Sequence, residues 1–340
     1  MNLFTKSNIK ALFQIFSPAL LGLLLFYNIS YTDDIETYYL FYLNNDVGDF
    51  GFQVLENIGH WFNLSFLGFE NLTFFVILSL FSFVFFKFGV NTYIGLLLTI
   101  LLNYVQIANQ LRYFIAVPLL LISIYYFFVE EKRITSCLLA VVAFLFHSGI
   151  IAWISFIPIC YYLKCKEKNV LFRFFSIIGV VIFLAYSTLS GYLFSIDSKY
   201  ETYITESSSG LGLIFILLYP LFCINWILLV YKGKVDSLRM NNPQILGYVM
   251  SIFTVVWIIA SFTGFQIINA RYVNAFFVVW IIAIYSSKNA VEISNKYAIF
   301  FSAGAIFFKQ IFPVIIFGFI DSDLYKITLI WQSRFTNLLY

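Results

Sequence analysis

The sequence predicts an all-α, polytopic integral membrane protein with about eleven transmembrane helices, on the basis of composition, apolar runs and charge placement. Of the 340 residues, 61% are hydrophobic and 11% are charged, and the mean hydropathy is +0.90. Soluble domains are about half apolar and about a quarter charged. This composition excludes an ordinary soluble domain, a nucleic-acid-binding protein, a secreted disulfide scaffold and a disordered chain.

Apolar runs recur along the whole chain, many of them near the roughly 20 residues that a membrane helix needs. Lys6 and Lys10 precede the first run, and no small-x-small cleavage site follows it, so we expect an uncleaved first span. The stretch 134–163 predicts two short helices that break at His147-Ser148-Gly149, with one long helix as the alternative. We expect a single membrane domain over 1–340. The predicted spans are 11–29, 71–86, 90–107, 113–129, 134–147, 148–163, 171–190, 211–231, 245–264, 272–286 and 297–320.

The charges set the expected orientation, with the N-terminus inside and the C-terminus outside. Alternating the predicted spans in this way puts most basic residues in short inside loops, as the positive-inside rule requires. Joining 134–163 into one helix would reverse every later loop and place its lysines outside. The basic residues assigned to the inside are Lys6, Lys10, Lys87, Lys132, Arg133, Lys164, Lys166, Lys168, Arg173, Lys232, Lys234, Arg239, Lys288 and Lys296.

The first external loop, about 30–70, is acidic and aromatic and contains no Lys or Arg. Within it, 52–67 predicts an amphipathic interfacial helix with Trp61 and Phe62 at headgroup level. The inside loops are too short for a cytosolic catalytic domain, so we expect any chemistry at the outer leaflet. The acidic residues of this loop are Asp33, Asp34, Glu36, Asp46, Asp49, Glu56 and Glu70.

Arg112 and Arg271 lie at the expected outer ends of two spans, against the charge bias, and amide residues precede both. An arginine near the membrane is costly and often marks a substrate path. Its planar fork suits bidentate phosphate binding, so the two residues together could hold a lipid diphosphate. The alternatives are a snorkelling anchor or a structural ion pair with an outside acid.

His147 lies at the expected outer end of an apolar span, where it is either a functional titratable group or a helix-breaking structural residue. Asp34, Tyr38, Tyr42 and Asp49 combine carboxylates with tyrosines. Carboxylates accept bonds from sugar hydroxyls or act as bases, and aromatic faces stack on sugar rings. A solvated acidic loop with an aromatic belt is the alternative. No nucleotide-binding or metalloprotease motif occurs, and no metal site is expected.

The order of these features resembles that of EpsG-type, Wzy-like polysaccharide polymerases. The resemblance comprises Asp34, Tyr38 and Tyr42, followed by Asp49-x-Gly51-Phe52-x-x-Leu55 in the first external loop. It continues through Arg112-x-x-Ile115-Ala116, Phe146-His147-Ser148 and Arg271-Tyr272, and so covers about 34–272. The chain departs from the pattern at Asp49, where glutamate is expected, at Phe50, where proline is common, and at Tyr113, where glutamine is common.

The resemblance implies a multi-pass protein of the bacterial inner membrane that polymerises O-antigen, capsule or exopolysaccharide. Such an enzyme joins oligosaccharide repeats carried on undecaprenyl diphosphate at the outer leaflet, without metal or cofactor, and a chain-length regulator is a possible partner. Arg112 and Arg271 would hold the diphosphate, and Tyr38 and Tyr42 would shape the sugar groove. His147 or Asp34 would serve as the base, and Asp49 would belong to the same site. A lipid-linked oligosaccharide flippase and a membrane acyltransferase remain the competing classes.

Overall fold

The computed structural model describes residues 6–29, 32, 34–44, 49–150, 266–286, 295–320 and 322–336, together with isolated residues between 243 and 254. Every regular element in these residues is helical, which agrees with the predicted all-α class. The elements are α1 (Lys6–Phe26), α2 (Ile35–Asn44), α3 (Phe50–Trp61), α4 (Phe66–Phe88), α5 (Thr92–Asn109), α6 (Leu111–Phe128), α7 (Arg133–Phe146), the 3-10 turn η1 (Ser148–Ile150), α14 (Gln266–Tyr285), α15 (Asn295–Ile306), the π-helix η4 (Phe307–Ile311), α16 (Phe312–Phe317) and α17 (Asp323–Thr336).

The chain forms two compact units, which are described separately. Unit 1 comprises Met1–Ile154, Tyr285–Ser287 and Ser302–Tyr340, and unit 2 comprises Ser155–Ile284 and Lys288–Phe301. The described residues thus include α1 to α7 and α17 of unit 1 and α14 of unit 2, whereas α15 begins in unit 2 and ends in unit 1.

Within the described residues, five helices are long and apolar enough to cross a membrane, so the chain is a multi-pass membrane protein. α7 and the stretch Val273–Tyr285 are shorter apolar helices that match two further predicted spans. The predicted spans 171–190 and 211–231, and most of 148–163 and 245–264, lie outside the described residues. The five long helices are Asn8–Phe26, Phe66–Phe88, Thr92–Asn109, Leu111–Phe128 and Tyr297–Phe317.

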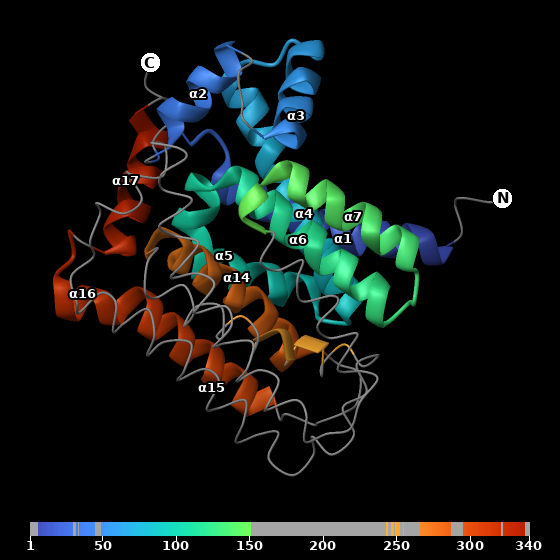
Figure 1. Ribbon diagram of the computed structural model, residues 1–340. Helices are drawn as coiled ribbons and strands as arrows, with labels where there is room; N and C mark the ends of the chain where they lie inside the picture. The colour runs from blue at the N-terminus through green and yellow to red at the C-terminus, as the bar shows by residue number, and fades with distance from the viewer. Residues whose placement is uncertain are drawn as a thin grey trace, which may run out of the picture. The chain divides into compact units, whose positions relative to one another are not determined.

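In unit 1, α1 packs along α4, and α6 packs between α4 and α7 (Figure 1). Local signals fix the ends of α4: the Ser65 side chain accepts a hydrogen bond from the Gly68 amide, and Gly89 closes the helix at φ +71°. Helices commonly end in this left-handed conformation, which glycine adopts without strain. α5 then starts at once, because the Asn91 side chain caps the Tyr93 and Ile94 amides. These signals end α4 and begin α5 within a few residues, and the two helices contact each other.

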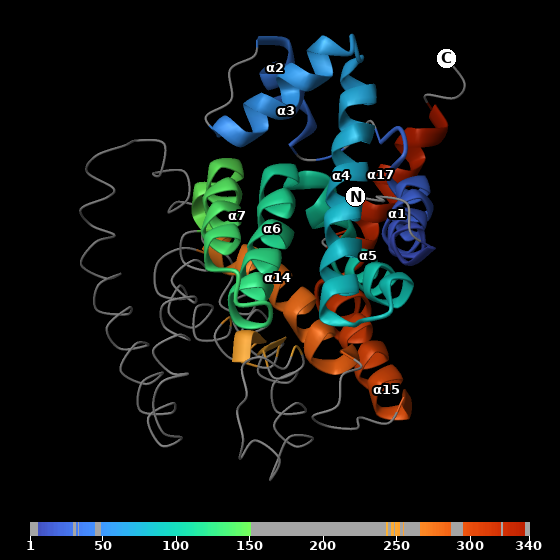
Figure 2. The ribbon, with the colours of Figure 1, turned by 90° about the vertical axis from the view of Figure 1, so that its right-hand side faces the viewer.

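The predicted external loop folds into two short helices, α2 and α3, which lie together over one end of unit 1 (Figure 2). The predicted amphipathic helix over 52–67 is confirmed as α3, but the helix begins at Phe50 and ends at Trp61. Asn63 adopts a left-handed backbone with φ 51°, so it separates α3 from α4, and residues 66–67 belong to α4. Trp61 and Phe62 are exposed, as an interfacial position requires. The sequence did not predict α2.

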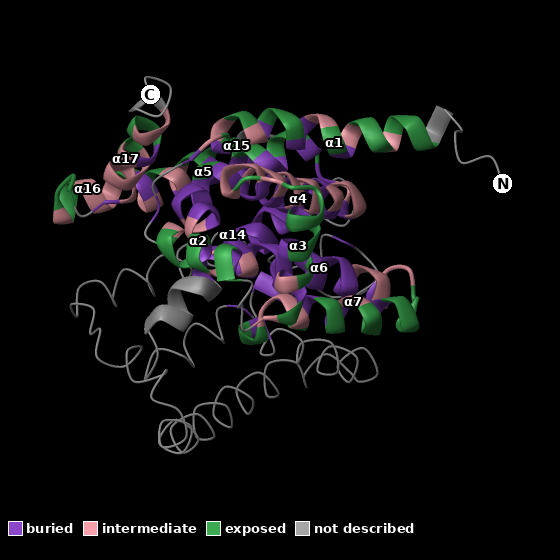
Figure 3. Ribbon diagram, turned by 90° about the horizontal axis from the view of Figure 1, so that it is seen from above, coloured by how far each residue is buried: buried purple, intermediate pink, exposed green. Residues whose placement is uncertain are grey.

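Apolar side chains remain exposed on the outer faces of α1 and α7, whereas α4 and α6 are largely buried (Figure 3). Leu21 and Leu24 of α1 and Ile134 and Leu138 of α7 are each more than half exposed. An exposed apolar face is costly in water but not against lipid tails. The distribution therefore fits a bundle that is surrounded by lipid.

A polar cluster joins α5 to the C-terminal part of unit 1. Lys309, a basic residue inside the predicted span 297–320, lies in the π-helix η4, and its Nζ donates to Asn103 Oδ1 over 3.1 Å. Asn103 itself breaks helical geometry within α5, at φ −134°. One turn further on, Gln106 Nε2 donates to Asp323 Oδ2 over 2.8 Å. The distortion at Asn103 in α5 and the π-helix η4 thus meet through polar side chains. Because α15, η4 and α16 follow one another without a gap, the apolar run 297–320 is helical at Lys309.

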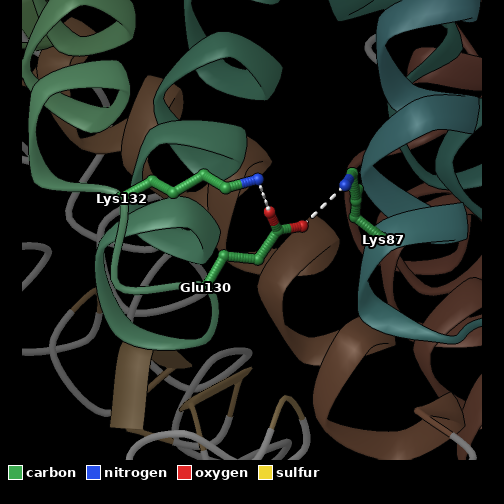
Figure 4. A network of polar contacts seen from close by, with 3 residues as sticks. All are labelled: Lys87, Glu130 and Lys132. Atoms are coloured by element: carbon green, nitrogen blue, oxygen red, sulfur yellow. Dashed lines mark hydrogen bonds and ion pairs between the residues drawn. The ribbon is translucent and has the colours of Figure 1, made fainter. Parts of the chain in front are cut away.

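At the opposite end of unit 1 from α2 and α3, Glu130 accepts hydrogen bonds from Lys87 at 2.7 Å and from Lys132 at 2.6 Å (Figure 4). Lys87 also lies 4.9 Å from the centroid of the Tyr126 ring. All three charged residues follow or end predicted spans on the side assigned to the cytoplasm. The network therefore joins the end of α4 to the turn between α6 and α7, as the predicted alternation of these spans requires.

Glu130→Gln should lower thermal stability at neutral pH by an amount that disappears in acid. Burial raises the pKa of Glu130, but the hydrogen bonds from Lys132 and Lys87 lower it further, so the net pKa lies below the ordinary value. This stabilisation is present above the unfolded pKa of about 4.3 and is lost as the pH falls through the folded pKa. Thermal unfolding in detergent across this range checks the expectation. The exposed neighbour Glu131→Gln is the control, and an equal effect of both changes would contradict the network's role.

Candidate functional site

Arg112 and Asp49 form an ion pair at the end of unit 1 that α2 and α3 cover. Arg112 Nη1 lies 2.6 Å from Asp49 Oδ2, and both side chains are mostly buried. The structural alternative considered for Arg112, an ion pair with an acid of the predicted external loop, is therefore present. The pair leaves Arg112 Nε buried without a hydrogen-bond partner. A buried donor without a partner is costly, so this nitrogen retains an unused capacity to donate a hydrogen bond.

Helix boundaries place both members of this pair. Asp49 is the N-cap of α3, but its side chain makes no capping hydrogen bond, so its carboxylate can reach Arg112. Gln110, at φ −117° and ψ 54°, ends α5 and begins α6, and its side chain makes no capping bond either. Arg112 thus sits in the first turn of α6. The amides of a helix N-terminus favour negative charge.

His147 joins the same cluster from α7. It is the C-cap of this helix, in extended conformation, and the predicted break at His147-Ser148-Gly149 is confirmed as the end of α7 followed by η1. Its Nδ1 lies 3.9 Å from Asp49 Oδ2, and its ring meets the Tyr113 ring edge-on at 5.5 Å. Burial would raise the pKa of Asp49, but hydrogen bonding by His147 and the charge of Arg112 outweigh it, and the pKa lies below the usual range. Asp49 therefore remains an anion between two basic groups.

Tyr38 and Phe41 of α2 place aromatic rings against Arg112. The guanidinium carbon lies 5.9 Å from the Tyr38 ring centroid and 5.5 Å from that of Phe41, within the range of cation–π attraction. Burial raises the pKa of Tyr38, against the opposing charge of Arg112. Tyr38 is therefore neutral at physiological pH and presents a hydroxyl beside the arginine.

Tyr42 has a different surrounding from Tyr38. Its hydroxyl donates to the Leu64 carbonyl over 2.7 Å, and its ring stacks on His60 at 4.2 Å and on Phe69 at 4.7 Å. His60 Nε2 in turn lies 2.9 Å from the Tyr42 carbonyl oxygen. The Tyr42 hydroxyl is thus committed to the backbone, and the residue holds α2 against α3 and α4.

Of the remaining predicted site residues, Asp34 lies one turn before Tyr38, and Arg271 is outside the described side chains. Asp34 is exposed just before α2, and its charge still reaches Tyr38. Arg271 lies on α14 in unit 2, and its side chain is outside the described residues. Its predicted meeting with Arg112 therefore stays a prediction. The cluster of Asp49, Arg112, His147 and Tyr38 is called the arginine site below.

Glu56 is a buried carboxylic acid that the sequence reasoning did not single out. It is 0% exposed, and neither carboxyl oxygen has a hydrogen-bond partner. Burial raises its pKa to about 7, although the charge of Arg112 opposes the rise. A signal was present, because residue 56 follows Phe52 by four positions and precedes Gly59 by three. Residues at these spacings share one helix face, so Glu56 lies on the apolar face of the predicted amphipathic helix.

No group of three or more His, Cys, Asp or Glu side chains within the described part of the chain could hold a metal ion.

The EpsG family model matches residues 10–328, which is nearly the whole chain. No curated protein and no solved structure matches the chain.

Proposed function

Because the chain belongs to the EpsG family, which makes it a membrane protein of the polysaccharide-polymerase type, we propose a specific reaction for it. The chain joins oligosaccharide repeats carried on undecaprenyl diphosphate, at the outer leaflet of the bacterial inner membrane. The donor is a growing glycan on its lipid diphosphate, and the acceptor is the terminal sugar of a fresh lipid-linked repeat. The product is O-antigen, capsule or exopolysaccharide.

The observation that carries this proposal is the arginine site itself. Arg112 sits at a helix N-terminus, paired by one nitrogen to Asp49 and flanked by the Tyr38 and Phe41 rings. A diphosphate entering from the headgroup layer would find a guanidinium whose orientation is already fixed. Preorganised positive charge stabilises the negative charge that builds on a leaving diphosphate, and such electrostatic effects often supply most of the catalysis.

The other residues have supporting roles in this scheme. Asp49 fixes the guanidinium, and His147 faces the same carboxylate oxygen, Oδ2, through its Nδ1. Tyr38 places a neutral hydroxyl beside Arg112, where the first sugar of the donor would meet it. Arg271 is proposed as the second diphosphate ligand, on the strength of its position after an amide-rich stretch that opens α14.

A polymerase, a flippase and an acyltransferase would each act differently on the same lipid-linked repeats. We expect the purified chain in lipid nanodiscs to convert lipid-linked repeats into a ladder of longer glycans, releasing one undecaprenyl diphosphate for each new glycosidic bond. No sugar nucleotide or acyl donor should be required, and chelation of metals should leave the rate unchanged. Repeats that stay single under these conditions would contradict the polymerase. Movement of repeats between leaflets of sealed vesicles would then indicate a flippase, and acyl incorporation an acyltransferase.

A further inference from the structure

The buried carboxyl of Glu56 has no structural task that explains its position. It shares the inward face of α3 with Phe52, Leu55 and Gly59, which are all buried. A hydrophobic side chain there would avoid the cost of burying two oxygens that bond to nothing. Groups that reduce stability in this way are typical of sites where function requires them.

Helix α3 links Glu56 to the arginine site. The helix begins at Asp49, the carboxylate that binds Arg112. One turn before Glu56, Phe52 packs against Tyr38 with ring centroids 5.6 Å apart. The charge of Arg112 also acts to lower the pKa of Glu56, against the larger effect of burial. The acid and the arginine therefore lie at the same end of unit 1.

We propose that Glu56 is the general base that accepts the proton of the acceptor sugar's hydroxyl. This inference rests on the proposed polymerase function. The acceptor oxygen forms its bond to the anomeric carbon of the donor sugar while its proton passes to a Glu56 oxygen. The bond between that carbon and the diphosphate oxygen breaks, and undecaprenyl diphosphate leaves with the electron pair beside Arg112. Neither carboxyl oxygen has a hydrogen-bond partner, so one can accept from the acceptor hydroxyl once that hydroxyl reaches the inward face of α3, where Glu56 is buried.

The two bases expected from the sequence differ from Glu56 in their surroundings. Asp34 is exposed, so water competes for its carboxylate. His147 Nδ1 lies 3.9 Å from the Asp49 carboxylate that binds Arg112, and the His147→Gln variant below separates its role from that of Glu56. Glu56, by contrast, has a pKa raised to about 7. The most efficient bases titrate near the working pH.

The groups that surround Glu56 define its pH response. Arg112 on α6 is the charged group that acts on it, and Tyr42 on α2 has its own pKa raised by burial and by the Glu56 charge. On α3 itself, the titratable His60 follows Glu56 by one turn. The other elements packed against α3 are α4, which carries Glu70, and α7, which ends at His147. Deprotonation of Glu56 places a second negative charge near Arg112. A base accepts a proton only in its deprotonated form, so polymerisation should require a pH at which this carboxylate forms.

The test compares wild-type protein, Glu56→Gln and the matched control Glu36→Gln in nanodiscs with lipid-linked repeats, from about pH 5.5 to about pH 8.5. Glu36 is exposed on α2, so its change removes the same charge from the same loop. We expect the wild-type kcat to rise with pH to a plateau, with a midpoint near the Glu56 pKa of about 7. Glu56→Gln should lower kcat by about a hundredfold or more and abolish this step, with KM within about twofold of wild type. Glu36→Gln should behave as wild type.

Three results would overturn the assignment while leaving the polymerase intact. They are a wild-type rate that does not change with pH, a Glu56→Gln variant that keeps the wild-type rate and profile, and loss of the pH step in His147→Gln alone. The first needs no variant, so the proposal stays testable even if Glu56→Gln fails to insert. If wild-type protein makes no polymer at any pH, the proposed function itself fails.

Discussion

Arg112→Lys is expected to abolish long glycan chains although it conserves the positive charge. A lysine keeps an attraction for Asp49 but loses the planar fork that can bind a carboxylate and a phosphate at once. Removing one well-placed donor from a site of developing charge commonly lowers kcat by about a hundredfold or more. The measurement is the length distribution of glycans in cells and in nanodiscs, together with the amount of protein in the membrane.

The matched control for this change is Arg133→Lys. Arg133 is an exposed arginine at the first residue of α7, at the opposite end of that helix from His147. Arg112→Ala should fail as Arg112→Lys does, and it should also lower stability, because it leaves the Asp49 carboxylate without its closest partner at a cost of about 1–3 kcal/mol. A normal ladder of chain lengths from Arg112→Lys would leave bidentate diphosphate binding without support.

Gly51→Val should damage the site without touching a charged residue. A Cβ at Gly51 would lie 3.0 Å from the Leu145 carbonyl carbon and 3.0 Å from the Phe146 ring. A valine must therefore push α3 away from the end of α7. Asp49 lies two residues before this contact and His147 directly after it, so the distance between them should grow. Overpacking of this kind costs about 1–3 kcal/mol, and misplacement of the site should lower kcat by about tenfold or more.

Gly304→Val is the control for this change. Gly304 also lies within a helix, α15, and a Cβ there meets nothing within 4 Å. Thermal unfolding separates the two variants, and the polymerisation rate measured well below the unfolding temperature separates loss of site geometry from loss of fold. If Gly51→Val polymerises as fast as Gly304→Val, the packing of α3 on α7 does not position the site.

The membrane helices were predictable because each depends on a local property, namely a long apolar run bounded by polar residues. The expected spans 71–86, 90–107 and 113–129 correspond to α4, α5 and α6 with shifts of a few residues. The shifts come from caps: Ser65 starts α4 earlier than hydropathy indicates, and Gly89 ends it later. The short helix α2 was not predicted, because its aromatic residues pack on α3 and α4 rather than following an apolar run.

The site was predictable residue by residue but not in its contacts. The charge bias singled out Arg112, and the break in the apolar run singled out His147. Their shared partner Asp49 is distant from both in sequence, so only the fold could pair them. The sequence reasoning missed Glu56 because an acid in an acidic loop is expected to be exposed to solvent, whereas the Glu56 side chain of α3 is buried. Arg271 remains a prediction because its side chain is outside the described residues.

Binding of undecaprenyl diphosphate, without any sugar, tests most directly whether Arg112 recognises the carrier. Native mass spectrometry of the detergent-purified chain would compare wild type, Arg112→Lys and Arg133→Lys over a series of lipid concentrations. Saturable binding by wild type and Arg133→Lys, with affinity at least about tenfold weaker in Arg112→Lys, is the predicted result. Equal affinity in all three proteins would contradict the assignment of the guanidinium to the diphosphate.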